Sequence, residues 1–92
     1  MLKVRINVSG RVQGVGFRYT TMFWAQELGD IHGYVKNLDD GTVYIEATGP
    51  KDKVTKFIDG LKQKASSAAF VDKIEVVEDD TIEITDTFRI RG

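Results

Sequence analysis

A glycine-rich segment constrains the fold of this chain more than any other feature. The segment GRVQGVGFR, residues 10–18, places three glycines within seven positions and ends on Arg18. Before it, apolar residues alternate with polar ones, at Leu2, Val4, Ile6 and Val8, which predicts a half-buried strand. After it, residues 19–28 contain no Gly or Pro. If this segment and the two residues before it are helical, one face of the helix carries Phe17, Thr21, Trp24, Ala25 and Leu28. The segment is therefore predicted to be a loop between a strand and a helix that ends at Gly29.

The rest of the chain alternates between strand and helix patterns. Residues 31–38 and 42–48 predict two strands joined by a hairpin turn at 39–41. Residues 49–65 predict a helix that begins near Pro50 and buries the stripe Val54, Phe57, Ile58 and Leu61. Gly60 weakens this helix by up to about 1 kcal/mol relative to Ala. Residues 71–78 and 81–91 again predict strands.

This order predicts a single domain over residues 1–92 with an α+β fold. The expected architecture is the ferredoxin-like split βαβ sandwich: βαββαβ with an extra C-terminal strand, and two helices on one face of an antiparallel sheet. That fold hosts many unrelated functions, so the function has to be argued from particular residues.

Composition and charge limit the function classes. The chain has no cysteine, which excludes disulfides, thiolate catalysis and a cysteine metal site. It has no apolar run long enough for a membrane span and no signal-peptide pattern, so we expect a cytoplasmic location. The net charge of −1 argues against a dedicated nucleic-acid binder. Residues 1–26 nevertheless contain Lys3, Arg5, Arg11 and Arg18 and no acid, either by chance or to hold a small anion.

The glycine-rich loop has two interpretations from its residues alone. Its backbone N–H groups can converge on an anion beside the N-terminus of the following helix, with the fork of Arg18 closing the cradle. The alternative is a tight turn followed by an exposed arginine. A P-loop would need Gly-Lys-Ser/Thr where the chain has Gly16-Phe17-Arg18, and a dinucleotide fingerprint would need glycine at Tyr19. Both of those motifs are excluded.

The run Gly10–Arg18 resembles the signature of the acylphosphatase family, and Gly33–Val43 (GYVKNLDDGTV) resembles a second stretch of that family. The resemblance covers roughly residues 4–91. It implies that the phosphate is bound by the loop residues Gln13, Gly14, Val15, Gly16, Phe17 and Arg18. It also implies that Asn37 positions the attacking water; taken alone, Asn37 is a strand-end residue near a hairpin.

The reaction implied by this resemblance is hydrolysis of a small-molecule acyl phosphate to a carboxylate and inorganic phosphate. The carboxylate is a good leaving group, so we expect direct attack by water without a covalent intermediate, cofactor or metal. We expect a monomer that holds inorganic phosphate or a similar anion in its site and binds neither nucleic acid nor membrane. His32 is expected to lie too far from Asn37 to share its site, and Glu78–Asp80 to form a solvated acidic turn.

Two other functions stay open. Tyr34 and Tyr44 could line an open sheet face that stacks RNA bases, although the later strands are acidic. The chain could also be a non-catalytic, phosphate-binding regulatory domain. Met22-Phe23-Trp24 forms an apolar triplet that belongs either to the core or to a contact patch for self-association.

Overall fold

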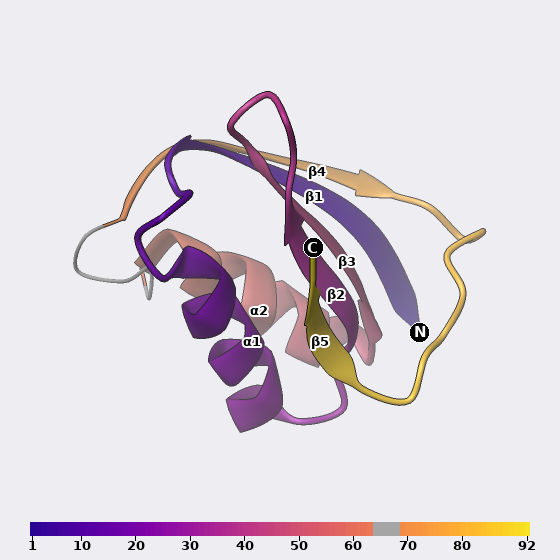
Figure 1. Ribbon diagram of the computed structural model, residues 1–92. Helices are drawn as coiled ribbons and strands as arrows, with labels where there is room; N and C mark the ends of the chain where they lie inside the picture. Colours follow the sequence, from indigo (N-terminus) through magenta and orange to yellow (C-terminus); the bar gives the residue numbers. More distant parts are fainter. Residues whose placement is uncertain (64–68) are drawn as a thin grey trace.

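The computed structural model describes residues 1–63 and 69–92. This part of the chain contains five strands and two helices (Figure 1). In chain order they are β1 (Leu2–Arg11), α1 (Phe17–Leu28), β2 (His32–Asn37), β3 (Val43–Gly49), α2 (Lys51–Gln63), β4 (Phe70–Glu78) and β5 (Phe88–Arg91). Neither helix is long and apolar enough to cross a lipid bilayer.

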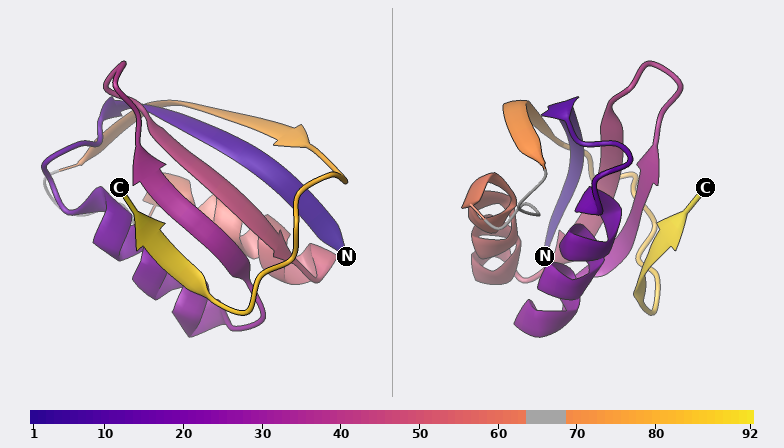
Figure 2. Two further views of the ribbon diagram at one scale, coloured as in Figure 1. Left: turned by 45° about the vertical axis from the view of Figure 1, so that its right-hand side comes forward. Right: turned by 60° about the vertical axis from the view of Figure 1, so that its left-hand side comes forward.

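The strands form one sheet in the order β4-β1-β3-β2-β5. Antiparallel pairing joins β1 to both β3 and β4, and β3 to β2. Both helices lie against the same face of the sheet, so that the molecule has two layers and one sheet face is free of helices within the described residues (Figure 2). The predicted ferredoxin-like α+β fold is confirmed.

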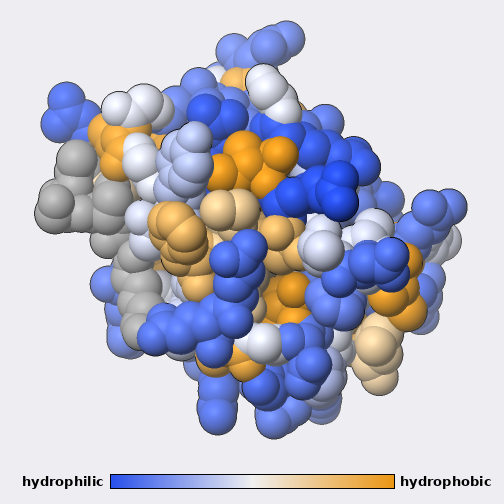
Figure 3. All heavy atoms as spheres, turned by 60° about the horizontal axis from the view of Figure 1, so that its bottom comes forward, coloured by the Kyte–Doolittle hydropathy of each residue, from blue (hydrophilic) through white to orange (hydrophobic). Residues whose placement is uncertain are grey.

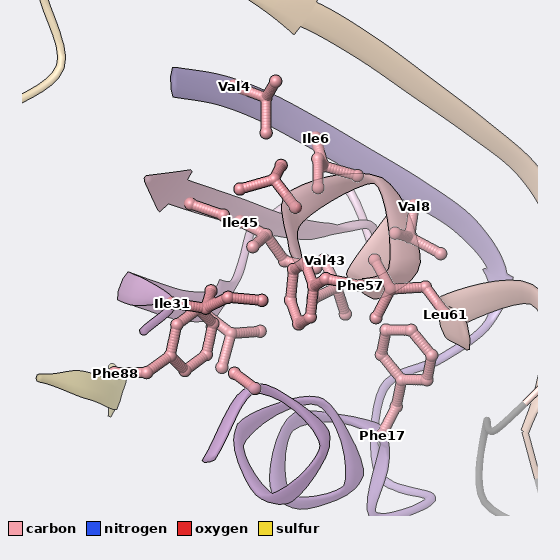
Figure 4. Close-up of a cluster of buried hydrophobic side chains, with 14 of the residues drawn as sticks. Val4, Ile6, Val8, Phe17, Ile31, Val43, Ile45, Phe57, Leu61 and Phe88 are labelled. Atoms are coloured by element: carbon pink, nitrogen blue, oxygen red, sulfur yellow. The ribbon is translucent and has the colours of Figure 1, made fainter. Parts of the chain in front are cut away.

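The core lies between the sheet and the two helices. The predicted alternation is confirmed, because the side chains of Val4, Ile6 and Val8 on β1 and of Val43, Ile45 and Ala47 on β3 are buried. The Phe57 ring on α2 meets the Phe88 ring on β5 edge-on, with 5.7 Å between their centroids. Figure 4 shows Phe17, the first residue of α1, pointing into this cluster towards Leu61. Full burial of such a ring stabilises the fold by about 1.5–3 kcal/mol, and it also fixes the end of the glycine-rich loop.

The C-terminal segment differs from the sequence prediction. Residues 81–91 were expected to form one strand, but only Phe88–Arg91 does so, and it pairs parallel to β2. The chain has to travel from the β4 edge of the sheet to the opposite edge, and residues 79–87 make this connection. Asp79 starts it with a turn in which its carboxylate accepts hydrogen bonds from the backbone N–H and the hydroxyl of Thr81. The sheet is therefore mixed, with an antiparallel core of four strands.

The second helix begins at Lys51, and the Pro50 carbonyl accepts the hydrogen bond from the Val54 N–H group, as a residue just before a helix does. The predicted end of this helix at residue 65 lies outside the described residues. The buried side chains on this helix include Val54, Phe57 and Leu61, so three residues of the predicted apolar stripe are confirmed as core.

Gly60 allows the two helices to pack closely. A Cβ added at Gly60 would lie 2.1 Å from Nε1 of Trp24 and 2.4 Å from its Cε2. The indole is held in place because Nε1 donates a hydrogen bond to the Phe57 carbonyl, at 3.2 Å. The Trp24 ring therefore occupies the space that any side chain at position 60 would need. This steric requirement explains the glycine despite its low helix propensity.

Substitution of Gly60 by Ala is expected to destabilise the fold by about 1–2 kcal/mol. Overpacking typically costs about 1–3 kcal/mol, and the better helix propensity of Ala returns up to about 1 kcal/mol. Urea denaturation of the wild type and of Gly60→Ala measures this difference. In a Trp24→Leu background the same substitution should become neutral or stabilising, and a destabilisation unchanged by that background would contradict the steric explanation.

The helix side of the molecule shows hydrophobic atoms in the middle of the surface with hydrophilic side chains around them (Figure 3). Within the triplet Met22-Phe23-Trp24, Met22 and Trp24 are half-buried and pack against the core. Phe23 is 60% exposed, and its ring lies 6.5 Å from that of Tyr19, which is also exposed. The apolar contact surface that the triplet could offer is thus reduced to Phe23 and its neighbour Tyr19.

Candidate active site

The glycine-rich loop runs from the end of β1 to the start of α1. Gly14 and Gly16 have φ angles of +73° and +82°, which side-chain-bearing residues rarely adopt. Gly16 caps α1 in a left-handed conformation, and it has no side chain to accept a hydrogen bond from the first N–H groups of the helix. The first turn of α1 contains no acidic residue. Its free N–H groups and the positive end of the helix dipole therefore face the loop, an arrangement that favours an anion.

Gln13 fastens the loop to the hairpin between β2 and β3. Its Nε2 donates hydrogen bonds to the carbonyl oxygens of Leu38, at 2.7 Å, and Thr42, at 2.9 Å. The side chain of Gln13 is thus occupied, so any contact of this residue with an anion would come from its backbone. The same holds for Phe17, whose ring is buried in the core. Leu38 directly follows Asn37, so this link brings the loop to the end of β2.

Arg18 lies in the first turn of α1 and reaches towards the same end of the sheet. A hollow of about 220 Å³ is lined by Val12, Gly14, Gly16, Phe17, Arg18 and Tyr19. Gly92 lies between Arg18 and Lys36. A Cβ built on Gly92 would be 3.9 Å from Nη1 of Arg18 and 3.8 Å from Cβ of Lys36. The Arg18 guanidinium therefore approaches the end of β2. It forms no ion pair with any residue in the described ranges, which leaves its fork free for an anion.

Asn37 is the last residue of β2 and pairs with Val43, whose side chain is buried on the helix side. Directly paired residues share a face of the sheet, so Asn37 points to the side on which the loop and α1 lie. Its Oδ1 atom is buried and has no hydrogen-bond partner within the described structure. A buried carbonyl oxygen without a partner is uncommon, and it is suited to accept a hydrogen bond from a water or ligand.

The structure brings together the residues that the sequence singled out. The loop residues 13–18 and Asn37 meet at one end of the sheet, through the Gln13 link and the approach of Arg18. His32 is at the opposite end of β2 from Asn37, as expected. No group of three or more His, Asp or Glu residues in the described ranges is arranged to hold a metal ion. The sequence analysis missed the bracing role of the Gln13 side chain, because a glutamine inside a glycine-rich run gives no sign of its partners.

Comparison with known proteins identifies the family of the chain. The acylphosphatase family model matches residues 4–90. An acylphosphatase of Enterococcus faecalis is 46% identical over 90 residues, which cover 98% of each chain. The crystal structure of acylphosphatase from Bacillus subtilis has a TM-score of 0.93 at 41% identity and covers 100% of both chains. T. kodakarensis HypF matches at 34% identity with a TM-score of 0.87; the match covers 100% of this chain and 12% of HypF.

These matches extend over nearly the whole chain in sequence and in structure. The chain therefore belongs to the acylphosphatase family.

Proposed function

We propose that this chain hydrolyses acyl phosphates by direct attack of water on phosphorus, at the site formed by residues 13–18 and Asn37. The observation that carries the proposal is the buried, unpartnered Oδ1 of Asn37 at the end of the sheet where the glycine-rich loop leads into a helix N-terminus without acidic residues. An acceptor next to a cluster of donors fits a reaction in which a water and a phosphate have to be held side by side.

The loop and Arg18 bind the phosphoryl group in this proposal. The backbone N–H groups from Gln13 to Phe17 and the guanidinium of Arg18 donate to its oxygens. In phosphoryl transfer, catalysis comes mainly from positioning and from stabilising negative charge on the equatorial oxygens. Donors that are fixed before the substrate arrives provide this stabilisation without a reorganisation cost. The buried Phe17 ring and the Gln13 link keep the loop in place.

Asn37 orients the nucleophile in this proposal. A water that donates one hydrogen bond to Oδ1 has its lone pair free to attack phosphorus opposite the departing carboxylate. The P–O bond to the acyl group then breaks, and its electron pair leaves with the carboxylate. A phosphate oxygen of the substrate accepts the proton of the water. The leaving carboxylate needs no protonation, so no general acid is required.

We further propose that the reaction needs no metal ion, because Arg18 and the loop N–H groups supply the positive charge. The test is release of inorganic phosphate from benzoyl phosphate by the purified protein in the presence and absence of EDTA. We expect saturable turnover that EDTA leaves unchanged. Activity that EDTA abolishes and Mg²⁺ restores would contradict the metal-free reaction. A folded protein without turnover would contradict the catalytic assignment.

A second candidate is a non-catalytic phosphate-binding domain. The match to a small part of HypF favours it, because domains of this fold also occur within longer chains. In that case inorganic phosphate would bind at residues 13–18 and benzoyl phosphate would not be hydrolysed.

The expected cytoplasmic location and monomeric state stay predictions. Cell fractionation tests the location, and sedimentation tests the oligomeric state.

A further inference from the structure

The face of the sheet that carries no helix in the described residues has a cationic and aromatic surface of its own. Two rows of register partners cross the central strands there. One row consists of Asn7, Tyr44, Lys36 and Arg91, and the other of Arg5, Glu46, Tyr34 and Arg89. These side chains point away from the helices, because their strand neighbours such as Ile6, Ile45 and Val35 are buried in the core. This surface lies on the opposite side of the sheet from Asn37.

Four of these residues, together with Asp79, form a charge-compensated network. The Arg5 guanidinium donates to the Asp79 carboxylate at 2.5 Å and to the Tyr44 hydroxyl at 2.7 Å. The Tyr44 hydroxyl donates to Oε2 of Glu46 at 2.8 Å, and the Tyr34 hydroxyl donates to the same oxygen at 3.0 Å. Burial, followed by this hydrogen bond to Glu46, raises the pKa of Tyr44 to about 12. Both tyrosines thus stay neutral, and their rings are held in fixed positions.

Two further cations of these rows, Lys36 and Arg91, are not compensated. Lys36 and Arg91 are register partners on neighbouring strands, and neither forms an ion pair with a carboxylate among residues 1–63 and 69–92. Arg91 lies over the Tyr34 ring at 4.1 Å from its centroid, and Nζ of Lys36 is 5.9 Å from the centroids of both tyrosines. Like charges placed directly opposite each other on a sheet repel. A bound anion between Lys36 and Arg91 would remove that repulsion.

A hollow extends from Arg91 between the sheet and the segment that connects β4 to β5. Figure 2 (left) shows this connection passing in front of the strands, on the side away from the helices. Two adjoining hollows, of about 310 and 290 Å³, share the lining residues Gly33, Tyr34, Thr85 and Arg91. Their walls also include the exposed Ile84 and the carboxylates of Glu83 and Asp86. The walls therefore combine the cations of Arg5, Arg89 and Arg91 with an apolar surface and hydrogen-bond acceptors.

We propose that this open face binds a nucleoside monophosphate, with the phosphate between Lys36 and Arg91 and the nucleoside in the hollow lined by Tyr34, Ile84 and Thr85. A nucleoside monophosphate has an anionic end, a flat ring, and hydroxyl and amino groups that donate to carboxylates such as those of Glu83 and Asp86. The size of the hollow is in the range of small-molecule pockets. A longer nucleic acid fits less well, because Asp79, Asp80, Glu83 and Asp86 would repel further phosphates. This inference does not depend on the proposed function, since the two sites share no residue.

Titration of the ¹⁵N-labelled protein with AMP, followed by two-dimensional NMR at low salt, tests the proposal. We expect saturable shifts at Tyr34, Lys36, Thr85 and Arg91. The double substitution Lys36→Gln/Arg91→Gln should weaken AMP binding at least about tenfold, as expected for lost charge-assisted hydrogen bonds. Lys73→Gln on β4 is the matched control, because it removes one cation from the same face far from the hollow, and should leave the affinity unchanged.

Three results would overturn the proposal. AMP shifts confined to residues 13–18 would place its phosphate in the hydrolytic site instead. Equal affinity for inorganic phosphate and AMP at Lys36 and Arg91 would show an anion site that ignores the nucleoside. Much tighter binding of a single-stranded oligonucleotide than of AMP would identify a nucleic-acid surface. The charge substitutions lie on the surface, and well-dispersed spectra of the variants verify that they fold.

Discussion

Substitution of Arg18 by Gln is expected to lower kcat for benzoyl phosphate by at least about 10²–10³-fold. The guanidinium is the one side-chain cation that lines the hollow beside the loop, and it has no ion-pair partner among the described residues. Gln keeps a polar side chain of moderate length but loses both the charge and the fork that matches two phosphate oxygens. The backbone N–H groups of the loop remain, so a residual rate above that of water is expected.

Matched variants separate the charge of Arg18 from its shape. Arg18→Lys keeps the positive charge without the fork, and its kcat should fall between those of the wild type and Arg18→Gln. Arg89→Gln removes an arginine that hydrogen-bonds Thr87 on the open face, and it should leave kcat within about twofold of wild type. The affinity for inorganic phosphate should fall with Arg18→Gln. Near-normal turnover in that variant would disprove the assignment of Arg18 to the phosphate site.

Much of the fold follows from the periodicity of the sequence. Alternation in β1 and β3 placed Val4, Ile6, Val43 and Ile45 in the core, and Gly29 marked the end of α1. These predictions depend on contacts between near neighbours and on the two faces of a strand, so a local pattern is sufficient. The hairpin at residues 39–41 is likewise local, and Gly41 has the positive φ expected of its turn.

The path from β4 to β5 could not be predicted in the same way. The alternation in residues 81–87 is genuine, and Ile82 is buried, but these residues form no strand of their own. Only at their end does the Thr87 carbonyl accept a hydrogen bond from the Gly33 N–H group on β2. Their conformation is set by the need to cross from one edge of the sheet to the other and by the turn at Asp79. Both are properties of the assembled sheet. A window of a few residues carries no information about them.

The candidate site likewise contains residues that the local sequence could predict and residues that it could not. The glycine-rich loop and Arg18 are contiguous in sequence, so their role in anion binding could be inferred from the loop itself. Asn37 looked ordinary on its own, and only the resemblance singled it out. Its distinguishing property is a buried oxygen without a partner, which results from the burial produced by distant segments. Lys36 and Arg91 are adjacent on the open face but far apart in the sequence, so the periodicity of the sequence could not predict that they meet.

Substitution of Asn37 by Ala is expected to lower kcat by about 10²-fold or more while the affinity for inorganic phosphate changes by less than about threefold. The Asn37 oxygen binds water in the proposed mechanism, and the phosphate is held by other groups. Its removal therefore affects the orientation of the nucleophile and leaves phosphate binding intact. Benzoyl phosphate turnover and phosphate titration by calorimetry measure the two quantities separately.

The stability of the Asn37→Ala variant distinguishes this role from a structural one. Oδ1 has no hydrogen-bond partner within the described residues, so its deletion breaks no hydrogen bond and removes a buried polar atom. The free energy of unfolding in urea should therefore stay unchanged or rise, even though kcat falls. Asn37→Asp is the matched variant, since it keeps the size and the acceptor but adds a negative charge that repels phosphate. It should lose phosphate affinity, which Asn37→Ala retains. A loss of phosphate affinity in Asn37→Ala, or a large loss of stability with normal turnover, would show that Asn37 does not position the water.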